Sequence, residues 1–284
     1  MPHHIGKDED IAAALLRLAG DELAAAQRQV AGGEARADRV HDARRRLKRV
    51  RTLLRVLEPG PGERAEAARR SVATIAQMLA GARDADVAAA SARELAAMTP
   101  RAAELGFDRV VTVLEREAIR AHRERTPLAE VDRLLTRLKA EVAALASETF
   151  DGGALLEAGF ARAYRRGRRW MRRAHCLGTP ELHHWRKCVK ELWHLLWLAG
   201  KRISRKAKKV EPVLDRLDSL LGLDHDHAVL ADRLALSPAG DPALMAQLAL
   251  IADRRRELEA EAFELGEAVY GESPRAFVRS LDLS

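Results

Sequence analysis

Apolar residues recur along this chain at spacings of three and four positions, the spacing that places them on one face of a helix. One stripe runs through Val40, Ala43, Leu47, Val50, Leu54 and Leu57, and another through Leu134, Leu138, Val142 and Leu145. No segment alternates apolar and polar residues convincingly at the two-residue period of a strand. The pattern therefore predicts an all-α protein.

Clusters of proline and glycine divide this pattern into pieces of helical length, with breaks at 58–62, 99–100, 126–127, 151–153, 178–180, 237–238 and 271–274. The predicted helices cover residues 8–31, 38–58, 63–80, 84–98, 106–123, 128–147, 154–174, 180–200, 206–221, 226–236 and 242–270. Boundaries placed in this way are accurate to about two to four residues.

The sequence also resembles itself at an offset of 142 residues, which is half of its length. Segment 40–54 (VHDARRRLKRVRTLL) aligns with 182–196 (LHHWRKCVKELWHLL), and 79–89 (LAGARDADVAA) aligns without a gap with 221–231 (LGLDHDHAVLA). Two separate matches at one offset indicate a tandem duplication joined near 150–153. Each half is long enough for a four-helix bundle with additional helices, so we predict two repeats, 1–149 and 150–284.

Composition excludes several other classes of protein. Aromatic residues make up 4% of the chain, which argues against large β-sandwiches and barrels. No run of about 18 apolar residues predicts a transmembrane helix, and the charged start MPHHIGKDED lacks the apolar core of a secretory signal. The two cysteines, Cys176 and Cys188, fit a reducing compartment. We expect a soluble, cytoplasmic protein without disulfides.

Positive charge is concentrated on one side of the predicted helix 38–58. The chain has 49 Lys and Arg against 42 Asp and Glu, a net charge of +7 at pH 7. A cationic stripe, separate from the apolar one at 100° per residue, contains His41, Arg44, Arg45, Lys48, Arg51, Thr52 and Arg55. Asp42 is the one acid between 41 and 57, whereas an ordinary solvated face mixes both signs. An arginine-rich composition alone fits a GC-rich genome, so the arrangement is what favours a binding role.

The stripe recurs in the second half at His183, Arg186, Lys187 and Lys190, followed by Trp193 and His194. A third basic cluster, YRRGRRWMRRAH at 164–175, places Arg165, Arg168, Arg169 and Arg172 on one predicted helix face. A fourth, KRISRKAKK at 201–209, reads as a loop that enters a helix. We expect Lys208 and Lys209 in this fourth cluster to serve solubility.

Such surfaces bind polyanions, which leaves nucleic acid, an anionic membrane or free phosphates as ligands. Binders of single-stranded nucleic acid interleave aromatic stacking platforms with their cations. The tryptophans near these basic helices are spaced as core or wall residues instead, and no known nucleic-acid signature is present. A membrane-binding helix requires an exposed apolar face, which a sequence does not establish. A phosphate ligand without bases or sugars fits best.

Patterns that indicate catalysis or metal binding are scarce. The chain has no P-loop, no Gly-x-Ser-x-Gly elbow and no zinc-ligand spacing. The run Asp224-His225-Asp226-His227 looks like a metal cluster, but at most two of its side chains share a helix face, so we predict no metal there. Asp84 and Asp226 are expected to orient a histidine or arginine, or to cap a helix. We predict no catalytic residue and no cofactor.

Together these motifs resemble the CHAD family, the conserved histidine α-helical domains. The first-half motifs are His41-x-x-Arg44-Arg45-x-x-Lys48 and Leu79-Ala80-x-x-x-Asp84. Those of the second half are His183-x-x-Arg186-Lys187-x-x-Lys190 and Leu221-Gly222-x-x-x-Asp226. Segment 164–174 also resembles the family's second-half opening helix. The chain departs from the family pattern at Ala80, where glycine is usual, and in the strong positive charge of 165–172.

The resemblance implies two helical bundles related by an approximate twofold axis, with basic helix faces lining a groove or pore. It also implies non-catalytic binding of inorganic polyphosphate, and association with polyphosphate granules. The expected polyphosphate-binding residues are His41, Arg44, Arg45, Lys48, Arg51, Arg55, Arg165, Arg168, Arg169, Arg172, His183, Arg186, Lys187 and Lys190. His41 and His183 either donate to phosphate or act as neutral partners of Asp84 and Asp226. The alternatives are a nucleic-acid-binding protein and an accessory hydrolase of phosphate metabolism.

Overall fold

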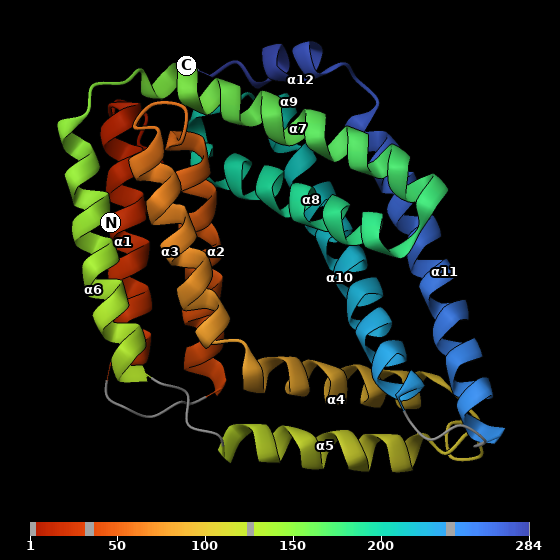
Figure 1. Cartoon of the computed structure of the whole chain (residues 1–284). Helices are drawn as coiled ribbons and strands as arrows, with labels where there is room; N and C mark the ends of the chain where they lie inside the picture. Colours follow the sequence, from red (N-terminus) through yellow and green to blue (C-terminus); the bar gives the residue numbers. More distant parts are fainter. Residues whose placement is uncertain (1–3, 32–36, 124–127, 237–241, 284) are drawn as a thin grey trace.

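The computed structural model describes residues 4–31, 37–123, 128–236 and 242–283, and every regular element within these ranges is helical (Figure 1). The all-α prediction is thereby confirmed. Four helices of the first half form a bundle in which each packs against two others. They are α1 (Ile11–Val30), α2 (Ala37–Leu57), α3 (Glu63–Met78) and α6 (Leu128–Ala144).

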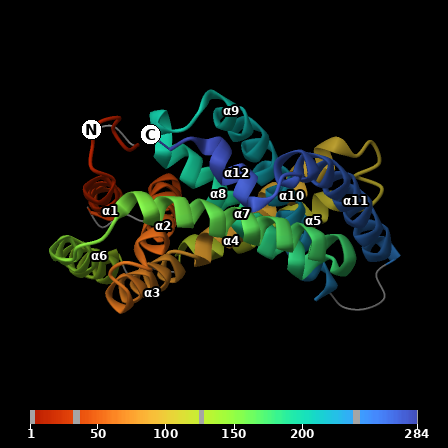
Figure 2. The same cartoon turned by 90° about the horizontal axis from the view of Figure 1, so that it is seen from above.

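A second set of four helices packs in the same cyclic manner in the second half. It comprises α7 (Gly152–Leu177), α8 (Thr179–Ala199), α10 (Val210–Ala235) and α11 (Pro242–Tyr270). Short elements complete this half and the join before it: η1 (Leu145–Ser147), η2 (Gly200–Arg202), α9 (Arg205–Lys208) and α12 (Pro274–Leu281). Seen from above, α7 runs from the first bundle across to the second, and it contacts α1, α2, α8 and α11 (Figure 2).

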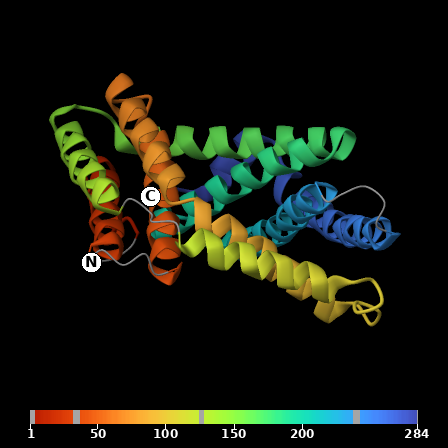
Figure 3. The same cartoon turned by 60° about the horizontal axis from the view of Figure 1, so that its bottom comes forward.

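A helical hairpin connects the far ends of the two bundles. Helices α4 (Gly81–Met98) and α5 (Phe107–Arg123) leave the first bundle and extend to α10 (Figure 3). There they form a separate core in which Phe107 and Leu114 pack with Leu230 and Ile251. The hairpin therefore belongs to residues 1–149 in sequence and packs with residues 150–284 in space.

The main core is continuous across both halves and contains residues from α1, α2, α3, α6, α7, α8 and α10. The predicted stripe of α2 enters it, since Ala43, Leu47, Val50, Leu54 and Leu57 are at most 1% exposed. Burial of this stripe fixes the rotation of α2 about its axis. The cationic side of α2 must therefore face away from the first bundle's centre.

Two helix predictions were wrong. Residues 210–235 form one helix, where the sequence predicted a break between 221 and 226. Gly222 lies inside that helix, and a Cβ atom there would lie 3.3 Å from Nη2 of Arg186. The glycine allows a close approach by a side chain and does not end the helix. Helix α12 was not predicted, although Ser273 caps it by accepting a hydrogen bond from the Ala276 amide.

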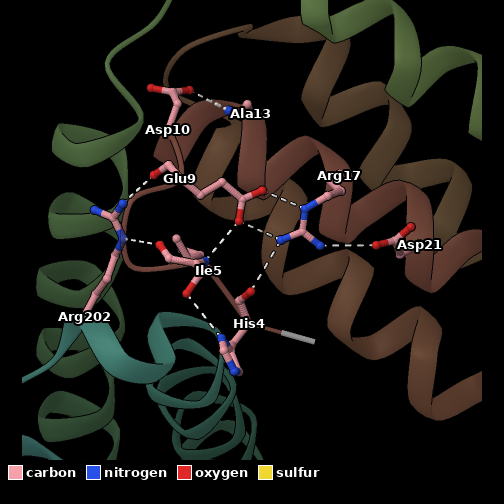
Figure 4. Close-up of polar contacts among 9 residues, drawn as sticks. His4, Ile5, Glu9, Asp10, Ala13, Arg17, Asp21 and Arg202 are labelled. Carbon is pink, nitrogen blue, oxygen red and sulfur yellow. Dashed lines mark hydrogen bonds and ion pairs between the residues drawn. The ribbon is translucent and has the colours of Figure 1, made fainter. Parts of the chain in front are cut away.

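The N-terminal segment ties the first bundle to the end of α8 (Figure 4). The Ile5 amide donates to the Leu198 carbonyl at 2.9 Å, and Arg202 donates to the carbonyls of Gly6 and Glu9. Arg17 of α1 pairs with the Glu9 carboxylate at 2.7 Å. The contacts of Ile5 and Arg202 join positions almost 200 residues apart in the sequence, so they hold the two halves together.

Several features match the predicted twofold relation between the halves. Both bounds of α8 lie 142 residues after those of α2. A residue on such an axis contacts its own counterpart, and Thr52 Oγ1 lies 3.3 Å from Nδ1 of His194, 142 positions later. Gln247 likewise donates to the carbonyl of Leu105, 142 positions earlier, at 2.6 Å. The duplication, and the repeats 1–149 and 150–284, remain predictions that these contacts support.

Candidate polyanion-binding site

Helices α2 and α8 meet at the contact between Thr52 and His194, and each brings a row of cations to this meeting point. We define the basic cluster as Arg44, Lys48 and Arg51 of α2 together with Arg186, Lys187 and Lys190 of α8. All six are among the predicted binding residues. The structure thus brings together side chains that are far apart in the sequence.

Loss of hydration and, after it, mutual repulsion lower the pKa of two lysines in this cluster. The pKa of Lys48 is lowered to about 8, first by loss of hydration and then by repulsion from Lys190, Arg186 and Arg44. Loss of hydration, followed by repulsion from Arg51, also lowers the pKa of Lys187. Both lysines nevertheless keep exposed surface. A side chain that is accessible and still partly dehydrated has protein on several sides, which is the environment of a binding surface.

Two cations of the basic cluster have an acidic neighbour. Lys190 pairs with Asp218 of α10 at 2.6 Å, and Arg44 lies 4.0 Å from Asp84 of α4. The side chains of the remaining four, Lys48, Arg51, Arg186 and Lys187, have neither an ion pair nor a hydrogen bond within the described part of the chain. The cluster therefore contains uncompensated positive charge.

The neighbouring arginines of α2 behave differently, because acids neutralise them. Arg45 pairs with Asp42 at 2.6 Å, and Arg55 pairs with Glu191 at 2.7 Å. Glu191 is 4% exposed and also accepts from Arg166 of α7 at 3.1 Å. The structure thus gives Arg55 a structural ion pair. The prediction missed Glu191, although an acid on the apolar face of α8 was a visible signal.

The two predicted histidines have different surroundings. His41 is exposed on α2. The His183 ring lies against His225 of α10, with ring centroids 4.4 Å apart, and its Nδ1 is buried without a hydrogen bond. Loss of hydration, and then repulsion from Lys187, lowers the pKa of His183 to about 4. The neighbour of His183 is therefore His225, a residue that the sequence offered only as part of a metal-like run.

The arginines of α7 do not form one track with the basic cluster. Arg169 lies on the α8 side, over Trp170, whose ring stacks on His184 with centroids 4.5 Å apart. Arg172 lines a pocket of about 370 Å³ between α7 and α11. No described contact joins Arg172, Arg165 or Arg168 to the basic cluster. Arg165 is exposed, and Arg168 is partly exposed. The binding role expected of these four arginines of α7 stays a prediction.

Metal-ligand clusters and membrane-spanning helices are two further features that the described ranges do not show. They contain no group of three or more His, Cys, Asp or Glu side chains arranged to hold a metal ion. None of the helices that the structure describes is both long enough and apolar enough to cross a bilayer. Asp224 pairs with Arg255 of α11 at 2.7 Å. Of the two acids that were expected to orient a histidine or arginine, Asp84 lies 4.0 Å from Arg44, and the role of Asp226 stays a prediction.

The fold and site together define a class: an all-helical protein of two interlocked bundles with a cationic surface between its central helices. The CHAD domain model matches residues 14–235, so the chain belongs to the CHAD domain family. The crystal structure of the CHAD domain from the plant Ricinus communis is similar, with a TM-score of 0.75, 16% identity and 94% of each chain covered. Among curated proteins, a search found no match to the chain.

Proposed function

We propose that this protein binds inorganic polyphosphate non-catalytically through the basic cluster. The observation that carries the proposal is the group of four cations, Lys48, Arg51, Arg186 and Lys187, whose side chains have no ion-pair or hydrogen-bond partner among the residues that the structure describes. Elsewhere on the same helices, arginines such as Arg46, Arg49 and Arg55 are neutralised by acids. Gathering like charges without compensation costs free energy, and a linear polyanion recovers it.

The chemistry of the cluster fits phosphate. Arginine offers a planar fork of donors to phosphate oxygens, and lysine adds a compact charge. Trp170 of α7 stacks on His184 and lies near the guanidinium groups of Arg169 and Arg173, and Trp197 of α8 lies under the guanidinium group of Arg49. Both rings already have partners, whereas binders of single-stranded nucleic acid present free stacking platforms, so these contacts favour polyphosphate.

The proposal includes a location and a partner. The free cysteines, Cys176 and Cys188, fit a reducing compartment. We therefore place the protein in the cytoplasm, with polyphosphate and polyphosphate granules as its partners. Membership of the CHAD family supports polyphosphate as the partner, because the resemblance to this family implies binding of inorganic polyphosphate.

A binding comparison tests the proposal. Long-chain polyphosphate, short polyphosphate and single-stranded DNA are titrated at one salt concentration, and phosphate release is followed in parallel. We expect long-chain polyphosphate to bind most tightly, without release of phosphate. Equal or tighter binding of DNA would favour a nucleic-acid-binding protein, and release of phosphate would favour a hydrolase.

The salt dependence provides a second test. A chain neutralised by several cations releases counterions, so the affinity should fall steeply between about 50 and 200 mM salt. We expect a loss of at least about tenfold for long-chain polyphosphate over this interval. An affinity that hardly changes would mean that the cations do not form the binding surface.

A further inference from the structure

A pair of histidines lies inside the proposed binding surface. His183 of α8 and His225 of α10 face each other with ring centroids 4.4 Å apart. Both are partly buried, and Nδ1 of His183 has no hydrogen-bond partner. The position 142 residues before His225 is Arg83, so the predicted repeat carries a permanent cation at the corresponding place.

The charges around this pair come from several helices and are mostly positive. Helix α8 contributes Arg186, Lys187 and the neighbouring ring of His184, and Lys48 of α2 lies close to Arg186. Helix α10 contributes Asp224 and Asp226. The first of these acids is already engaged by Arg255 of α11 at 2.7 Å. Asp226 is therefore the one nearby acid, among those described, that has no ion pair.

In the free protein this environment favours the neutral form of both rings. The pKa of His183 lies at about 4, lowered by loss of hydration and by Lys187. Loss of hydration, followed by repulsion from Arg186, also lowers the pKa of His225. A polyanion on the basic cluster cancels the field of Arg186 and Lys187 and adds negative charge, which favours the protonated rings.

We infer that the His183–His225 pair takes up protons when polyphosphate occupies the basic cluster, so that the affinity rises as the pH falls. This inference rests on the proposed function. Each proton taken up increases the affinity by about tenfold per pH unit, between the pKa values of the free and bound forms. We expect the affinity for long-chain polyphosphate to rise at least about tenfold from pH 7.5 to 5.5.

Two other titratable groups, the Lys48 side chain and the terminal phosphates of the ligand, also change their protonation with pH. Loss of hydration lowers the pKa of Lys48 to about 8 in the free protein, so this side chain is mostly charged in measurements below pH 7.5. Terminal phosphates titrate near pH 6, as phosphate monoesters do, and they release protons when cations bind them. Long chains have few terminal groups, and the sign of this effect is opposite to that of the histidines.

Titration calorimetry at pH 6.5 in two buffers with different ionisation enthalpies measures the protons taken up. We expect net uptake by the unaltered protein. The double variant His183→Gln/His225→Gln should still bind and should lose most of this uptake, whereas His175→Gln, on the exposed surface of α7, should keep it. His225→Arg supplies the permanent charge, so it should bind more tightly at pH 7.5 with a weaker pH dependence.

The outcomes separate this inference from the proposed function. Binding of polyphosphate without proton uptake, or uptake that survives the double variant, overturns the inference and leaves the proposed function intact. No binding of polyphosphate at any pH from 5.5 to 7.5 overturns both. Thermal melts establish that each variant is folded before it is titrated.

Discussion

At the scale of single residues, the basic cluster opposes stability. Lys48 and Lys187 are held beside other cations, and the pKa of each is lowered. Natural proteins retain such arrangements where a ligand compensates for them. Other arginines of the same helix, such as Arg45 beside Asp42, have an acid within ion-pair distance instead.

Replacing these two lysines should therefore separate stability from binding. We expect Lys48→Gln/Lys187→Gln to raise the thermal midpoint of the free protein by about 1–2 °C, since surface charge changes contribute about 0.5 kcal/mol. The affinity for polyphosphate should fall in the same variant. Lys201→Gln/Lys208→Gln, at exposed positions outside the cluster, is the matched control and should change neither property much. A lower midpoint with unchanged affinity would contradict this explanation.

The sequence predicted the cationic stripe of α2, but it did not predict which of these cations have an acidic partner. Arg44, Lys48 and Arg51 share their arc with Arg55, which the structure pairs with Glu191. That acid lies 136 positions away, so no local pattern reveals the pair. His225 was missed as the neighbour of His183 for the same reason, because the contact depends on how α8 packs on α10.

At the scale of helices, α10 shows how a glycine can serve a neighbouring side chain. Gly222 lies within the helix, and a Cβ atom would lie 3.3 Å from Nη2 of Arg186. Alanine is favoured over glycine inside a helix by about 0.5–1 kcal/mol. Glycine at position 222 therefore costs helix stability, and we infer that it is retained because it leaves room for the Arg186 side chain.

We expect Gly222→Ala to keep or raise stability and to weaken polyphosphate binding by displacing Arg186. Urea unfolding and a polyphosphate titration measure the two effects. Gly20→Ala in α1 is the control, because a Cβ there meets nothing within 4 Å. It should raise stability by a similar amount without changing affinity. Unchanged binding in Gly222→Ala would show that the glycine has no role in placing Arg186.

The helices themselves were largely predictable, since local periodicity determines them. The apolar stripe of α2 is buried as the pattern predicts. The docking of α4 and α5 on α10 was not predictable, because Phe107 and Leu230 meet only through long-range packing. A sequence pattern shows which face is apolar and does not show which partner covers it.

At the scale of the whole molecule, the two bundles depend on contacts between distant parts of the chain. Arg17 donates to Glu9, and Arg202 contacts the backbone of the same N-terminal segment. The hydrogen bond from Arg17 lowers the pKa of Glu9 to about 2. Ionised Glu9 therefore contributes stability above pH about 4.5, and this contribution is lost as the pH falls towards 2.

Glu9→Gln should thus reduce the free energy of unfolding at pH 7 by ~1–2 kcal/mol, as expected for hydrogen bonds to a charged group. The difference from the unaltered protein should disappear near pH 2, provided that both remain folded there. Urea unfolding at several pH values measures it. Glu104→Gln removes an exposed acid paired with Arg101 and should have almost no effect. A constant difference at every pH would contradict the role given to Glu9.

The most direct test of the central claim compares two variants that each lose four positive charges. One replaces Lys48, Arg51, Arg186 and Lys187 by Gln. The other replaces Lys7, Lys201, Lys208 and Lys209, which are exposed and lie outside the basic cluster.

The affinity of each variant for long-chain polyphosphate is measured at one salt concentration and one pH. The cluster variant should lose at least about a hundredfold, because charge-assisted hydrogen bonds contribute about 1.5–3 kcal/mol each. The control should lose at least about tenfold less. Equal losses in the two variants would show that only diffuse attraction to a basic protein is at work, and the basic cluster would not be the binding site.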